Sequence, residues 1–355
     1  MSSKSTRRSA LNSLAFWAAA SPSLTAQERQ LPQPMGEPPG RITPLAEVLN
    51  TFEMEAMAER KLSSTAFAAI AGGDRNAFQR IIFRPRRYIN AVEVNLTATL
   101  FGETMYTPIL VGPASEQQRF HPEGELATVR GASAVQTSVV ISDRSSQPIE
   151  KIVAEAKVGT WYQIFPQADM APVLNNVQRA VKAGCKVVII STGATPAKLP
   201  SNGNPQMSWA MVERVRQAAK TPVVLKGIMS PEEARVAAEK GVDGIVVSNY
   251  GGAYVQGTAA PMEVLSAVVD AVAGKIPVLI DGSFRRGSDV VKALAFGARG
   301  VLVVRPALWG LAAYGSDGVQ AAIQMLQSET ARTMNLCGKP TLALLDRTMV
   351  RISKH

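Results

Sequence analysis

The feature that most constrains the fold is a regular recurrence of short apolar runs rich in β-branched residues, each followed by a segment with helical periodicity. Continuous apolar runs of this length are typical of strands buried on both faces, as in parallel sheets. The segments between them, such as PEEARVAAEKG and GSDVVKALAFG, are amphipathic and end at glycine. The eight runs are residues 108–113, 138–143, 160–165, 186–191, 222–227, 244–249, 277–282 and 300–306.

Eight strand–helix units in succession predict an α/β fold, a (β/α)8 TIM barrel. Residues 45–72 carry apolar residues at helical spacing and end in glycines, so an N-terminal helical segment precedes the barrel. A doubly wound sheet is the alternative, but its GxGxxG turn is missing after every strand.

Composition narrows the class of protein. The 355 residues are 46% apolar and 19% charged, and the net charge is +10. No Lys/Arg-rich run with interleaved aromatics occurs, so diffuse surface charge is favoured over nucleic-acid binding. The chain has two cysteines without a CxxC partner and two histidines, which argues against a metal site and against Ser/Cys–His catalysis.

The N-terminal residues differ from the rest of the chain in their pattern of charged and apolar side chains. Arg7 and Arg8 precede a modestly apolar stretch, a pattern that resembles a twin-arginine export signal. The stretch is too short to span a membrane. We predict a signal over residues 1–26, a linker over 27–44 and a barrel domain over 45–355, with export to the periplasm. The alternative is a disordered basic tail on a cytoplasmic protein.

Polar groups stand at the carboxyl ends of the predicted strands, where chemistry sits in barrels of this kind. The run after the seventh strand, DGSFRRGSDVVKAL, combines a Gly/Ser turn and arginines with a helix start. Loops after strands 7 and 8 build phosphate sites in such barrels, so Arg285 and Arg305 indicate a phosphate. Surface salt bridges are the alternative for both. The strand ends carry Pro113, Ala114, Ser142, Gln163, Ser191, Thr192, Lys226, Ser248, Asn249, Asp281, Gly282, Ser283 and Arg305.

Lys226 needs an explanation, because burying an ammonium without a partner is costly. A Schiff base, a phosphate contact, a place beside an electron-rich ring such as reduced flavin, or an acidic neighbour inside the barrel would each provide one.

Six sequence blocks in order resemble the FMN-dependent 2-hydroxy-acid oxidase/dehydrogenase family, which includes glycolate oxidase, lactate oxidase and mandelate dehydrogenase. The resemblance extends from about residue 61 to residue 346. The blocks are RNAFQRIIFRPR (75–86), TPILVGPAS with HPEGELATVRGAS (107–133), TPVVLKG (221–227), GIVVSNYGG (244–252), IPVLIDGSFRRGSDVVKALAFGA (276–298) and VRPALWGLAAYGSDGV (304–319).

The resemblance implies FMN across the barrel mouth. It implies flavin contacts for Gln163, for either Ser191 or Thr192, and for Lys226 at the edge that becomes negative on reduction. Val304 replaces a family glycine, which removes one close backbone approach to the phosphate. The other implied cofactor contacts are Pro113, Ala114, Ser142, Ser248, Asp281, Gly282, Ser283, Arg285 and Arg305.

The substrate side departs from the family. Tyr250 stands where the family has its histidine base, and Ala253 where it has an arginine that binds the substrate carboxylate. Phe165 replaces a tyrosine, and the aspartate that pairs with the histidine falls at Gly193 or Ala194. A family tyrosine aligns near Ala69. The arginine of the insertion after strand 4 is absent, although Lys198 lies one place away.

Three functions remain open. The first is an FMN oxidoreductase with altered chemistry acting on an unknown small molecule. The second is a catalytically silent flavoprotein or partner subunit, and the third is hydroxy-acid oxidation rescued by Tyr250 and Lys198. These two are the candidate catalytic residues. Homo-oligomerisation is compatible with the family, whose members are often tetramers.

Overall fold

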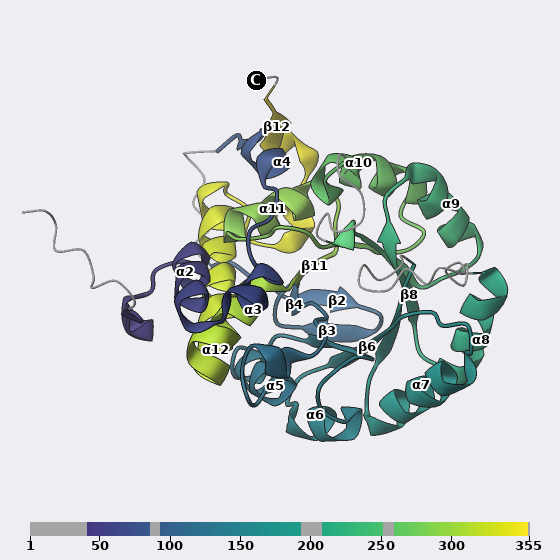
Figure 1. The fold of residues 1–355 in the computed structure, drawn as a ribbon. Coiled ribbons are helices and arrows are strands. Elements are labelled where there is room, and N and C mark those ends of the chain that lie inside the picture. The colour runs from purple at the N-terminus through teal and green to yellow at the C-terminus, as the bar shows by residue number, and fades with distance from the viewer. Residues whose placement is uncertain (1–40, 86–92, 193–207, 251–258, 354–355) are drawn as a thin grey trace, which may run out of the picture. The chain divides into compact units, whose positions relative to one another are not determined.

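Eight parallel strands form a closed barrel, which confirms the predicted fold. The computed structural model describes residues 41–85, 93–192, 208–250 and 259–353. Around the ring the order is β10-β11-β4-β5-β6-β7-β8-β9, and every predicted apolar run overlaps one of these strands (Figure 1). Their bounds are β4 Ile109–Val111, β5 Val139–Ser142, β6 Thr160–Ile164, β7 Val187–Ser191, β8 Val223–Ile228, β9 Gly244–Val247, β10 Val278–Ile280 and β11 Gly300–Val303.

Parallel pairing of the first and last strands closes the ring. Val301 of β11 is in register with Ile109 of β4, and Val303 with Val111. Nearly every strand residue is buried, as expected where side chains face either the barrel interior or the surrounding helices. All eight carboxyl ends therefore reach the same mouth.

Helices surround the barrel as an outer ring (Figure 1). Capping residues fix where several helices begin. Ser230 and Glu233 form a capping box at the start of α9, and Pro231 occupies the first position of that helix. Gly184 ends α7 with a positive φ of 125°. The helices are α5 Glu125–Ala134, α6 Ile149–Glu155, α7 Ala171–Ala183, α8 Trp209–Ala219, α9 Pro231–Glu239, α10 Pro261–Val272, α11 Gly287–Ala295 and α12 Arg305–Leu336.

The core has two parts. One fills the barrel interior around Trp161, which is fully buried and meets the Phe101 ring edge-on at 5.4 Å. Phe101 lies in the turn between β2 (Ala98–Leu100) and β3 (Glu103–Met105), which cover the end opposite the mouth. The other, larger part lies between the strands and the helices.

An N-terminal segment packs on the barrel mouth. It comprises η1 (Leu45–Glu47), α2 (Thr51–Lys61), α3 (Ser64–Ala68) and α4 (Asn76–Gln79); α2 and α3 fall within the predicted helical stretch. Thr51 Oγ1 donates to the Arg285 carbonyl at 2.6 Å, and Arg75 pairs with Asp289 at 2.8 Å. The remaining elements are β1 (Ile81–Phe83), which pairs with β12 (Val350–Ile352), and the 3-10 turns η2 (Gln117–Arg119), η4 (Leu342–Leu344) and η5 (Arg347–Met349).

The predicted signal, residues 1–26, and most of the predicted linker lie outside the described residues. Among the helices that the structure describes, none is long and apolar enough to cross a membrane.

Helix α12 folds back on itself at a break at Gly315, whose φ is 63°. The break brings the backbones of Gly310 and Gly318 together, so closely that a Cβ on either would collide with the other residue's carbonyl group. Only glycine at both places permits this approach.

Gly318→Ala should lower the free energy of unfolding by about 2–3 kcal/mol, because it overpacks a backbone-to-backbone contact. Gly102→Ala is the matched control, because Gly102 has a positive φ of 81° but open space around the added methyl. This variant should lower the free energy of unfolding by only about 1 kcal/mol. Urea unfolding measures both. Equal losses would show that the close approach does not limit stability.

Candidate active site at the barrel mouth

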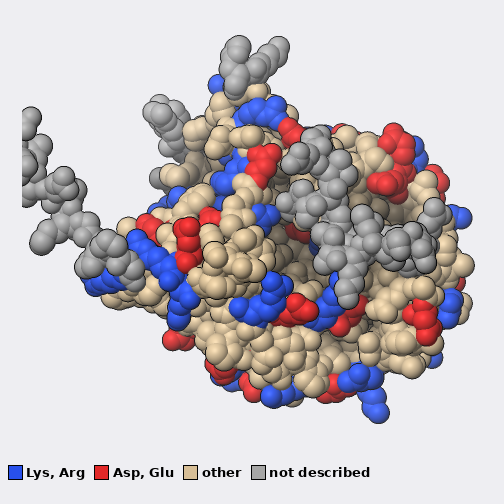
Figure 2. Space-filling model, in the orientation of Figure 1, with Lys and Arg blue, Asp and Glu red and all other residues tan. Residues whose placement is uncertain are grey.

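A cavity of about 530 Å3 opens among the carboxyl ends of the strands, within the usual range for ligand sites. Figure 2 shows this face hollowed at its centre, with basic and acidic side chains along the lower edge of the hollow. The predicted residues that line it are Pro113, Gln163, Lys226, Tyr250, Asp281, Gly282, Ser283, Arg285 and Arg305. Ala114, Ser142, Thr192 and Ser248 are not part of its lining.

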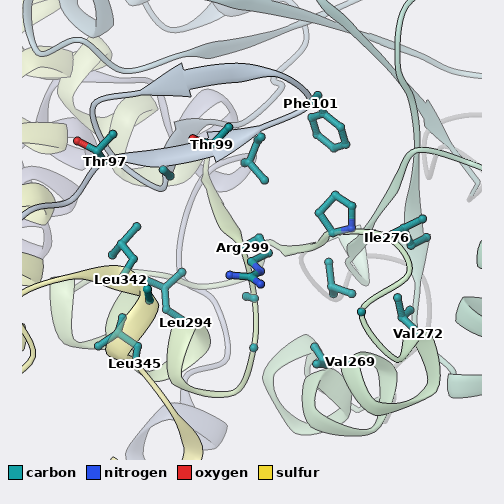
Figure 3. A pocket seen from close by; sticks show the side chains of 18 residues that line it. Thr97, Thr99, Phe101, Val269, Val272, Ile276, Leu294, Arg299, Leu342 and Leu345 are labelled. Carbon is teal, nitrogen blue, oxygen red and sulfur yellow. The ribbon is translucent and has the colours of Figure 1, made fainter.

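A larger cavity, about 870 Å3, lies at the other end of the barrel (Figure 3). The β2–β3 hairpin and the residues that precede β10 and β11 line it. Arg299 is the one charged residue of its lining. Because chemistry in these barrels sits at the carboxyl ends, we place the candidate site at the mouth.

Lys226 forms a buried ion pair at the centre of the mouth. Its Nζ lies 2.7 Å from Asp281 Oδ2 and donates to Ser248 Oγ at 3.0 Å. Of the four explanations for a buried lysine, the structure contains the acidic neighbour. Asp281 Oδ1 is buried and has no hydrogen-bond partner among the described residues. This oxygen can therefore still accept a hydrogen bond, for example from a hydroxyl group.

Tyr250 reaches from the loop after β9 to the end of β8. Its hydroxyl donates to the Lys226 carbonyl at 2.9 Å, and the Lys226 ammonium lies 4.5 Å from its ring centre. The same carbonyl accepts from the Thr192 N–H at 2.8 Å and lies 3.0 Å from its Oγ1. A carbonyl oxygen has two lone pairs, so the two hydroxyls compete for one of them.

The backbone conformation at Tyr250 and Gly227 allows the Tyr250 and Thr192 hydroxyls to lie close to the Lys226 carbonyl. Tyr250 has a φ of 55°, which is unusual for a residue with a side chain. Gly227 has a φ of 116°, and a Cβ there would press on Thr192 Oγ1 and the Tyr250 hydroxyl. Glycine after Lys226 therefore makes room for the phenol.

A second polar chain crosses the other side of the mouth. The Gln163 amide donates to Ser191 Oγ, so Ser191, rather than Thr192, lies beside the glutamine. Ser142 Oγ is 3.3 Å from Ser115 Oγ and accepts from the Arg144 backbone N–H at 3.2 Å.

Two arginines converge on one carbonyl. Arg285 Nη2 donates to the Gly72 oxygen at 2.6 Å, and Arg305 donates to the same oxygen. Arg285 is buried with its guanidinium 4.4 Å from the Trp309 ring centre. Burial, and then the Arg305 charge, lowers the pKa of Arg285. Two cations held close together, one of them buried, favour the binding of an anion.

Sequence reasoning missed two residues after β5. Arg144 lines the cavity, with its guanidinium 4.3 Å from the Phe165 ring centre. Asp143 accepts from the Phe165 N–H at 3.0 Å, while its Oδ1 is buried with no partner among the described residues. Burial raises the pKa of Asp143 to about 6. The signal was present, since two charged residues directly follow a strand end.

Several residues of the predicted substrate side fall outside the described part of the chain. Lys198, Gly193, Ala194 and Ala253 belong to this group. Ala69 does line the cavity.

The closed parallel barrel carries an arginine pair after its last two strands, the place where (β/α)8 barrels commonly bind phosphate groups. The sequence model of FMN-dependent dehydrogenases matches residues 58–198 and 191–352. The chain belongs to this FMN-dependent 2-hydroxy-acid oxidase family, and FMN is its cofactor.

Known relatives are similar along most of their length. A peroxisomal (S)-2-hydroxyacid oxidase of Arabidopsis thaliana is 34% identical over 351 residues, which cover 86% of this chain and 97% of the relative. An L-lactate oxidase of a Nostoc strain is 32% identical and covered completely, with 88% of this chain aligned. A crystal structure of mandelate oxidase superposes with a TM-score of 0.80 at 32% identity, covering 86% of this chain and 99% of that chain.

Asp143→Asn should change how stability depends on pH. The pKa of Asp143 is raised from 3.8 to about 6 in the folded protein, so the folded state binds the extra proton between these values. Stability therefore falls as pH rises through this window, by at most about 3 kcal/mol. The variant lacks this loss, so its advantage over the native chain should grow from pH 4 to pH 7.5 in urea unfolding.

Asp270→Asn is the control. Its hydrogen bond from Arg347 lowers the pKa of Asp270, so the stability that this carboxylate contributes is already present above its ordinary pKa. The difference between this variant and the native chain should therefore stay nearly constant from pH 4 to pH 7.5. An unchanged difference between the Asp143 variant and the native chain across the window would contradict the prediction.

Proposed function

We propose that the chain is an FMN-dependent oxidoreductase whose substrate chemistry differs from histidine-assisted oxidation of 2-hydroxy acids. The observation that carries the proposal is Tyr250, a phenol at the end of β9 whose hydroxyl already donates to a backbone carbonyl. It stands where the resemblance places a histidine base.

The mouth offers groups that fit FMN. Arg285 and Arg305 already share one oxygen acceptor, and a phosphate carries several such oxygens. The partnerless Asp281 Oδ1 suits a ribityl hydroxyl, which can donate to it. Gln163 and Lys226 supply donors at the cavity wall. We assign the cofactor contacts to these residues.

Bound FMN supplies a two-electron acceptor or donor at the mouth. The Lys226 ammonium, oriented by Asp281 and Ser248, would lie beside the bound cofactor and would stabilise negative charge on it. Tyr250 contributes one exchangeable proton beside this charge. Competition with Thr192 for the Lys226 carbonyl leaves one hydroxyl able to donate elsewhere.

A phenol suits some reactions better than others. Removing a proton from a hydroxy acid needs a base with a pKa near neutrality, whereas an ordinary phenol titrates near pH 10, about three units too high. A donor that is already acidic, or a substrate that is reduced and takes a proton from Tyr250, avoids this demand. We propose one of these two reactions.

A catalytically silent flavoprotein is the second candidate. It is favoured by the hydrogen bond that holds the Tyr250 hydroxyl on the Lys226 carbonyl, since a hydroxyl that donates to the backbone does not donate to a substrate.

Hydroxy-acid oxidation rescued by Tyr250 and Lys198 is the third candidate function. We further propose export through Arg7 and Arg8 and assembly with copies of itself.

Glycolate, lactate and mandelate should fail to bleach the flavin under anaerobic conditions at pH 7, because a phenol stands at the end of β9, where the resemblance places the histidine base. Illumination with a sacrificial donor should still reduce the flavin, as the control. Absorbance spectroscopy follows both. Bleaching by any of the three acids would contradict the proposal and favour rescued hydroxy-acid oxidation.

Arg285→Gln should weaken FMN binding about 10- to 100-fold, the value of one or two charge-assisted hydrogen bonds. Arg286→Gln is the matched control, because Arg286 is the next residue but pairs with Glu329 at 2.8 Å away from the mouth. Titration of flavin fluorescence measures both affinities. Equal affinities for the two variants would place the phosphate elsewhere.

A further inference from the structure

The cavity wall includes one arginine that is not used by the cofactor assignment. Arg144 follows β5, lines the mouth and lies with its guanidinium 4.3 Å from the centre of the Phe165 ring. Among the described residues no carboxylate lies within ion-pair distance of it. The adjacent Asp143 is turned to the Phe165 N–H instead.

The backbone fixes where this arginine stands. Ser142 Oγ accepts from the Arg144 N–H, and the Arg144 carbonyl accepts from the Glu116 N–H at 2.9 Å. Ser145 closes the turn by donating its hydroxyl to the Ser142 carbonyl at 2.6 Å. These bonds tie the turn to β5 and to the loop after β4.

Phe165 then orients the side chain. A guanidinium that stacks on an aromatic ring keeps its in-plane N–H groups free to make a bidentate contact with a carboxylate. Phe165 has no hydroxyl to compete for those donors. The pair is therefore a flat cationic surface at the edge of the cavity.

We infer that Arg144, held on Phe165, binds the carboxylate of an anionic substrate. This assignment rests on the proposed function and names its substrate class, small carboxylates. It places the cation across the barrel from the end of β9, because β5 and β9 stand opposite each other in the ring of eight. The anion thus binds beside β5 and β6, while Tyr250 approaches from β9.

The test compares mandelate with mandelamide, which has a similar shape and no charge. Isothermal titration calorimetry on the full chain as purified should show mandelate binding at least 10-fold more tightly than the amide. Arg144→Gln should abolish this preference, leaving amide affinity unchanged. Arg144→Lys should keep part of it, because the charge remains and the planar fork is lost.

Arg216→Gln is the control, since Arg216 pairs with Glu213 on α8 and should leave both affinities unchanged. The inference is overturned if Arg144→Gln still binds mandelate more tightly than mandelamide. It is also overturned if the native chain binds the two ligands equally. The flavin spectrum of the same samples tests the proposed function separately: a chain without bound flavin contradicts that function, whichever way the calorimetry falls.

Discussion

The pairing of β4 with β11 is the constraint on which the rest of the structure depends. It closes eight parallel strands into a ring, and a closed parallel ring brings every carboxyl end to one mouth. Lys226 and Asp281, far apart in the chain, thereby form a buried pair 2.7 Å apart. Burying either charge alone would be costly, so the closure that exposes these ends to one cavity also requires that their charges be matched.

The charged side chains at the barrel mouth form separate groups at different positions around the ring of strands. Arginines after β10 and β11 share one acceptor, and the lysine of β8 is balanced by the aspartate after β10. The β9 side carries the phenol of Tyr250, while Arg144 stands after β5. The groups that we propose for the cofactor and those that we propose for the substrate come from different strands, so one set can change while the other persists.

Apolar periodicity predicted the barrel because strands buried on both faces leave an unbroken pattern in the sequence. It also placed Arg285 and Arg305 on the two loops that meet. It did not predict the Gly72 carbonyl as their partner, since that contact joins residues 213 positions apart in sequence. The sequence left Ser191 and Thr192 open as flavin contacts, and it did not predict that the Gln163 amide donates to Ser191 while the Thr192 N–H donates to the Lys226 carbonyl. Arg144 was missed because its direction is set by hydrogen bonds in a turn, and no pattern of apolar residues reports them.

The Gly72 carbonyl already accepts from the two arginines that we propose as the FMN phosphate site. An oxyanion that binds the two arginines competes with this carbonyl, so part of its affinity offsets the loss of an internal contact. Gly72 and Gly73 have φ values of 61° and 133°, and glycine backbone turns with little steric cost. The chain before and after them is anchored separately, through Thr51 of α2 to the Arg285 carbonyl and through Arg75, which precedes α4, to Asp289. The acceptor of the two arginines therefore sits on two consecutive glycines, where a change of backbone direction has little steric cost, between two anchored parts of the chain.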